Sequence, residues 1–170
     1  MSLKKIWKKL THKERDRATY GVQRLARQEV VQTYDAIVTT NEVCDRHGTG
    51  VILRRIFGTS PGILSIKSTK LYPDHALGQA DLYFGHEGLS RPESFAQVVA
   101  ALNGNLVRRI VCVPFLPDEL ITAIVLKELF KAPLCVFLMD DNNIHAHGIP
   151  DDLMREALSK ASLRLAISPD

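Results

Sequence analysis

Two adjacent carboxylates follow the most apolar segment of the chain. Asp140 and Asp141 come directly after Leu134–Met139, and His145 and His147 lie a few residues downstream. A carboxylate at the mouth of a buried strand can take a proton from a substrate hydroxyl, hold a metal ion or cap the next turn. The spacing matches no known metal site. We predict that Asp140 and Asp141 are catalytic, with a structural cap as the equal alternative and a metal hydrolase as the weakest one.

A second group of candidate residues surrounds two glycines at the start of a predicted helix. Gly48, Thr49 and Gly50 follow His47, and glycines at a helix start let backbone N–H groups approach an anionic or hydroxyl-rich ligand. Close packing of the helix on a strand is the alternative reason for glycine. The dinucleotide fingerprint fails because Leu53 replaces its last small residue, and no Gly-Lys-Ser/Thr motif exists. These four residues are predicted to bind substrate, without a cofactor.

A third loop, over residues 84–90, contains His86 and Glu87 between glycines. Both side chains could bind substrate hydroxyls, although an ordinary surface loop is the favoured alternative. We include His86 and Glu87 among the predicted substrate-binding residues.

The segments that must position these residues alternate between two kinds. Helical periodicity occurs at 48–57, 90–104, 117–131 and 150–161, and short apolar or β-branched runs occur at 35–40, 63–67, 80–84, 109–114, 134–139 and 163–168. Short apolar strands separated by helices indicate βαβ units. The sequence predicts an α/β fold with an open, doubly wound parallel sheet of Rossmann-like type.

Residues 1–33 differ from the rest of the chain in charge. They hold nine lysines and arginines against three acidic residues, whereas the whole chain of 170 residues has a net charge of +3. Leu3, Ile6, Trp7 and Leu10 recur at helical spacing, and a second helix is predicted from Thr11 towards residue 32. Residues 3–10 could bind an anionic membrane surface, or both helices could pack on the domain. Because aromatic residues are not interleaved with the basic ones, we expect no nucleic-acid partner.

Composition limits the class of protein. With 45% hydrophobic and 24% charged residues the chain is long enough for one folded domain. No apolar run approaches the roughly 20 residues that span a bilayer. The three cysteines are an odd number without the spacing of a metal site, and two of them lie in apolar runs. This indicates reduced thiols, so we expect a cytoplasmic protein.

Residues 35–170 resemble, in pattern, the N-terminal, acceptor-binding half of a GT-B glycosyltransferase. The resemblance is carried by the glycine loop with its helix at 48–57, by the strand running into Asp140 and Asp141, and by the final helix, strand and serine at 158–168. It implies that the glycine loop faces a nucleotide sugar. It also implies that one of the two aspartates either acts as the base for the hydroxyl of a sugar or lipid-linked acceptor or only orients the sugar.

The same resemblance implies an incomplete enzyme. The donor-binding half of the GT-B family has no counterpart before the chain ends at Asp170, so we expect a fragment that is inactive alone. The alternative function is a stand-alone α/β module, regulatory or binding a small anion through the glycine loop.

Overall fold

The computed structural model describes residues 25, 29–40, 48–57, 62–68, 80–139 and 148–167. Several sequence predictions fall outside this part of the chain. They concern the basic arm over residues 1–24, His47, Asp140, Asp141, His145 and His147.

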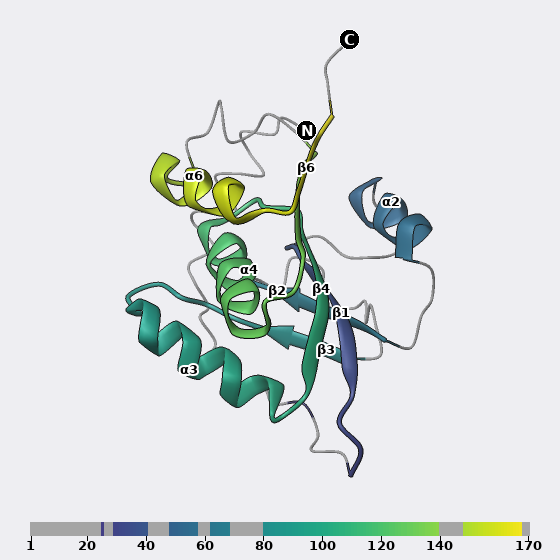
Figure 1. Cartoon of the computed structure of the whole chain (residues 1–170). Coiled ribbons are helices and arrows are strands. Elements are labelled where there is room, and N and C mark those ends of the chain that lie inside the picture. Colours follow the sequence, from purple (N-terminus) through teal and green to yellow (C-terminus); the bar gives the residue numbers. More distant parts are fainter. Residues whose placement is uncertain are drawn as a thin grey trace, which may run out of the picture.

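The described part of the chain contains six strands and four helices (Figure 1). Their bounds are β1 (Thr33–Val38), α2 (Gly48–Phe57), β2 (Ile63–Lys67), β3 (Ala80–Tyr83), α3 (Arg91–Leu102), β4 (Leu106–Cys112), α4 (Pro117–Phe130), β5 (Leu134–Leu138), α6 (Asp151–Lys160) and β6 (Leu163–Ala166).

All strands form one parallel sheet in the order β3-β2-β1-β4-β5-β6. The chain moves outward from β1 to β3, returns to the middle at β4 and moves outward again to β6. The predicted fold class, an open doubly wound α/β sheet, is confirmed. In such sheets the order in which strands are added changes from one side to the other between two central strands, here β1 and β4. Ligands bind beyond the carboxyl ends of these two strands.

The two faces of the sheet are covered differently. Helices α3, α4 and α6 lie on one side and α2 lies on the other (Figure 1). The larger core fills the first side, where α4 is buried along most of its length. The smaller cluster, under α2, contains Ile37, Leu53, Ile63 and Val113. Leu53 anchors α2 over the central strands, so the N-terminus of α2 is held on this side of the sheet.

A β-bulge explains why β4 was predicted to start too late, at residue 109. The register between β1 and β4 shifts at Tyr34/Asp35, so Arg108 and Arg109 both reach the Asp35 carboxylate, at 2.5–2.9 Å. Asp35 is 3% exposed. A buried aspartate and two consecutive arginines interrupt the apolar pattern from which strands are recognised. Strand β4 therefore begins at Leu106, three residues before its predicted start.

The second predicted N-terminal helix does not reach Gln32. Residues 29–32 are irregular, and the Gln32 N–H donates to the Asn105 side chain at 3.1 Å. Because β1 needs an extended approach beside β4, residues 29–32 are not helical.

The C-terminal end of α4 gives a stability prediction. Lys131, which is exposed, adopts φ 54°, ψ 20° in the left-handed region. Glycine lacks the Cβ atom that makes this conformation costly. We expect Lys131→Gly to raise the free energy of unfolding by about 0.5–1 kcal/mol, measured by urea denaturation. Lys131→Ala, which keeps Cβ, should have little effect. Equal effects of the two substitutions would refute this explanation.

Candidate functional site

The carboxyl ends of β1, β2 and β4 are joined by one buried carboxylate, that of Glu119. Glu119 lies in the first turn of α4 and is 1% exposed. Its Oε2 accepts the N–H groups of Phe115, at 2.5 Å, and Leu116, at 2.9 Å, in the turn after β4. Its Oε1 accepts the Ser68 hydroxyl, after β2, at 3.4 Å. The backbone of Thr40, after β1, is a further donor.

The protonation of Glu119 reflects two opposing effects. Burial raises the pKa of its carboxyl to about 7, although the hydrogen bonds that it accepts favour the ionised form. The hydrogen bonds that Glu119 accepts fix the geometry of three loops. Glu119 lies where the chain after β1 and the chain after β4 lead to helices on opposite sides of the sheet.

The N-terminus of α2 lies at the same edge, because a helix that connects two parallel strands starts where the first one ends. Its first turn contains no acidic residue. A Cβ atom built on Gly48 would have no described heavy atom within 4 Å. Packing against the described residues therefore does not require glycine at position 48. The positive end of the helix dipole favours an anion at such a position.

A lysine adds positive charge to this edge. Lys67, the last residue of β2, is 2% exposed, and its Nζ lies 5.9 Å from the centre of the Tyr83 ring. Ile63, Ser65 and Lys67 are every second residue of β2, so their side chains point to the same face of the sheet. Ile63 packs in the cluster under α2, so Lys67 also lies on the face that α2 covers. The α2 side of the switch point therefore holds a buried cation.

His86 occupies a buried position at the start of the loop after β3. Its Nε2 lies 2.8 Å from the Thr122 hydroxyl, which itself donates to the carbonyl of Asp118 at 2.8 Å. The Thr122 proton is thus committed, so His86 Nε2 is the donor and the ring is the Nε2–H tautomer. Burial, together with the positive charge of Arg91, lowers the pKa of His86 to about 4.

The structure places the predicted substrate-binding residues at separate points of the edge. Gly48, Thr49 and Gly50 form the first turn of α2, His86 is buried against α4, and Glu87 is exposed in the adjoining turn. The roles of these residues in binding stay predictions. In the described part of the chain no group of three or more side chains is arranged to hold a metal ion.

Sequence reasoning missed Glu119. The motif Pro117-Asp118-Glu119 is typical of an ordinary helix start, because acids in the first turn suit the helix dipole. A signal was nevertheless present: glutamate at the third helical position commonly accepts backbone N–H groups just before the helix. Its contact with Ser68, 51 residues away, depends on the sheet order.

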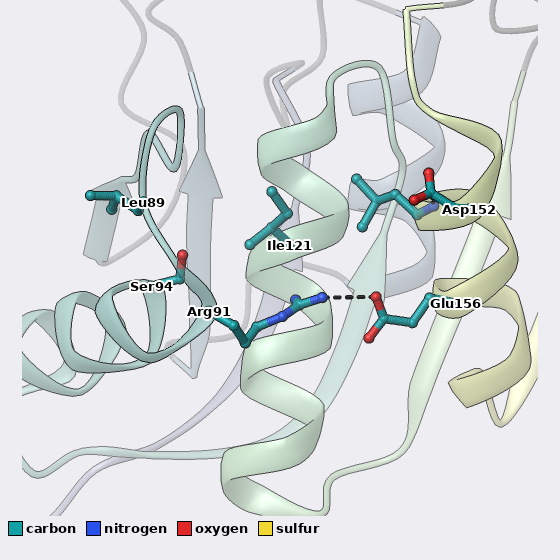
Figure 2. A pocket seen from close by; sticks show the side chains of 7 residues that line it. Leu89, Arg91, Ser94, Ile121, Asp152 and Glu156 are labelled. Carbon is teal, nitrogen blue, oxygen red and sulfur yellow. Dashed lines mark hydrogen bonds and ion pairs between the residues drawn. The ribbon is translucent and has the colours of Figure 1, made fainter.

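A separate hollow of about 400 Å³ lies between the N-terminal parts of α3 and α6, against α4 (Figure 2). Arg91, from α3, and Glu156, from α6, approach one another across α4, with Ile121 behind them and Asp152 to one side. The Arg91 Nη2 to Glu156 Oε2 distance is 2.8 Å. No sequence motif indicated this hollow, because its wall comes from three distant segments.

No family model and no curated protein matches the chain. Similar solved structures include the RCK domain of GsuK, with 15% identity and a TM-score of 0.49 over 84% of this chain and 28% of that one. The GsuK channel has 12% identity and a TM-score of 0.49 over 88% and 24% of the two chains. GsuK bound to ADP has 13% identity and a TM-score of 0.47 over 96% and 37%. This chain thus spans well under half of each, and the similarity concerns the fold alone.

The predicted resemblance to a GT-B glycosyltransferase half is wrong, since the similar structures named above are GsuK chains rather than glycosyltransferases. The predicted sugar transfer, the nucleotide-sugar donor and the sugar or lipid-linked acceptor are wrong with it. The physical reason is that the quoted features belong to the whole fold class. Glycines at a helix start and apolar strands ending in polar loops occur in doubly wound parallel sheets of any function.

Proposed function

We propose that this chain is a regulatory, ligand-binding α/β domain that takes a phosphate-bearing anion at the carboxyl edge of β1, β2 and β4. The observation that carries the proposal is the N-terminus of α2, which opens without an acidic residue at the topological switch point. Gly48, Thr49 and Gly50 would donate backbone N–H groups to the phosphate. Lys67 supplies positive charge on the same face of the sheet.

Binding fits this edge better than catalysis. The Glu119 carboxylate already accepts several hydrogen bonds from the surrounding loops, and His86 is buried and bonded to Thr122. The hydrogen bonds of both side chains fix the positions of neighbouring loops and helices, which supports a preformed binding surface. The domain would respond to a ligand through the three loops that Glu119 connects.

The cellular setting belongs to the same proposal. Cys112 is buried and neither it nor Cys135 forms a disulfide, as expected for a reduced, cytoplasmic protein. Among the described helices, none combines the length and the apolar composition needed to cross a bilayer.

Thermal unfolding with added ligand tests the proposal. Phosphate and ADP, the ligand named for one similar structure, should each raise the midpoint temperature in a saturable way. Gly48→Asp would place a negative charge where the anion binds and should abolish this rise. The free protein should keep its stability, because an acid in the first turn favours the helix.

Gly48→Asn is the matched control, because it adds a similar side chain without charge and should retain most of the ligand-dependent rise. Equal responses of the two variants, or no response of the natural chain to either anion, would contradict the proposal.

A further inference from the structure

We propose that the chain forms a two-fold symmetric dimer in which the edge strand β6 pairs with β6 of a second copy. Strand β6 ends the sheet beside β5, and no described strand lies beyond it (Figure 1). All four of its residues are exposed. This edge lies two strands away from β4, so the dimer is independent of the proposed anion site.

An apolar row occupies one face of this edge. Leu163, Leu165 and the next residue in alternation, Ile167, point to the same face and are 52%, 40% and 51% exposed. Leu163 and Leu165 lie beside Cys135 and Phe137 of β5, and Phe137 packs against the cluster under α2. The row is therefore on the α2 side of the sheet, where no described helix covers it.

The edge lacks the usual protection against pairing. Edge strands are normally blocked by charged side chains, prolines or bulges, because their free backbone groups otherwise pair with another strand. The only charged residue of β6 is Arg164, and its Nε donates to the carbonyl of Leu158 in α6 at 2.7 Å. The guanidinium is thus held against its own helix, on the face opposite to the apolar row.

The backbone of β6 determines how a partner strand can pair with it. The Ile167 N–H donates to the Leu138 carbonyl of β5 at 3.0 Å. Because the backbone groups of successive residues point to opposite edges of a strand, Leu165 also faces β5, whereas Arg164 and Ala166 direct their N–H and C=O groups outward. An antiparallel partner must therefore bond to Arg164 and Ala166.

A second copy of the chain satisfies this requirement in one register. With the two-fold axis at Leu165, the two copies of Leu165 form a pair without hydrogen bonds, and Arg164 exchanges both backbone hydrogen bonds with the partner's Ala166. Leu163 then lies opposite the partner's Ile167. Apolar side chains meet apolar ones, and the two arginines do not lie opposite one another. This self-complementarity assigns the edge to a second copy rather than to a different protein.

The size of the contact sets its strength. Interfaces below about 1,200 Å² in total belong to weak, transient complexes, and a contact of one short strand from each copy belongs to this class. A pair related by a two-fold axis closes on itself. We therefore expect a dimer that dissociates on dilution and that does not grow into larger assemblies.

Sedimentation velocity of the full chain, at concentrations up to about millimolar, tests the dimer. The mass should rise from that of one chain to that of two. Leu165→Lys places two like charges opposite each other and should weaken the dimer at least about tenfold. Val99→Lys, at a comparably exposed apolar residue of α3, should leave it unchanged. A natural chain that stays monomeric or grows beyond two copies, or equal effects of the two variants, would contradict the proposal.

Disulfide cross-linking tests the register separately. Leu165→Cys places two thiols in a pair whose Cα atoms are about 4.5 Å apart, within the range of a disulfide, so mild oxidation should link the two copies. In Arg164→Cys the introduced thiols are diagonal neighbours, about 7–8 Å apart, and should not be linked. The natural chain, with its own cysteines, gives the background. Equal linking of the two variants, or none above this background in Leu165→Cys, would overturn the proposed pairing.

Discussion

Replacing Glu119 with alanine is expected to lower the free energy of unfolding by about 3–5 kcal/mol. The substitution leaves the half-buried N–H groups of Phe115 and Leu116 and the hydroxyl of Ser68 without the buried carboxylate that accepts them. Chemical denaturation measures the loss directly. Because the same bonds fix the loops of the proposed anion site, the ligand-dependent rise in midpoint temperature should disappear as well.

Glu119→Gln separates hydrogen bonding from charge. Its carbonyl oxygen can keep the bonds from Phe115 and Leu116, and its amide can donate to the Ser68 hydroxyl. We expect a loss of less than half of that caused by alanine. If glutamine destabilises the domain as much as alanine does, the hydrogen bonds are not the reason for the effect.

The pH dependence of the Glu119 contribution has a definite sign. The pKa is raised to about 7 in the folded chain from 4.5 in the unfolded one, so the folded state binds the proton more tightly. The contribution of Glu119 to stability is largest below pH 4.5 and declines as the pH rises to about 7. The stability difference between the natural chain and Glu119→Ala should therefore shrink from pH 4.5 to 7.

Replacing Asp35 with alanine is the second large expected effect, a loss of about 2–3 kcal/mol. Asp35 is buried, and each of its oxygens accepts a hydrogen bond from both Arg108 and Arg109. Their side chains are 53% and 56% exposed, so water solvates the arginines when the carboxylate is removed. For this reason the loss should be smaller than for a fully buried ion pair. Urea denaturation at pH 7 gives the value.

Acid titration and two controls accompany this prediction. The hydrogen bonds from Arg109 and Arg108 hold the pKa of Asp35 well below its usual range. Its contribution is therefore complete above the unfolded pKa of 3.8 and is lost as the pH falls towards the lower folded value. Arg108→Gln or Arg109→Gln alone should cost less than about 1 kcal/mol, because the other guanidinium remains. A larger loss from either arginine than from Asp35 would contradict this account.

Most of the fold could be predicted from the sequence because its elements have strong local signals. Helix α2 over residues 48–57 and strand β2 over 63–67 have the predicted bounds, since their apolar spacing and glycine boundaries agree. Strand β4 was predicted late because two arginines inside it pair with a buried aspartate on another strand. Such a pairing across 73 residues has no local sequence signal.

The candidate sites were harder to predict than the fold. The glycines of α2 were identifiable because glycine at a helix start has a direct conformational meaning. The buried environment of Glu119 depends on loops from β1, β2 and β4, and the hollow at Arg91 depends on the packing of α3 and α6 beside α4. The family resemblance failed for a related reason, since it used features that this class of sheet requires in any family.

Amide spectra of the isotopically labelled chain, recorded while ADP is added, test the central claim most directly. The account predicts saturable shifts in the amides of Gly48, Thr49 and Gly50, accompanied by Phe115 and Leu116, and their loss in Gly48→Asp. Saturable shifts confined to other parts of the chain, or unchanged amides at the start of α2 with millimolar ADP, would contradict it.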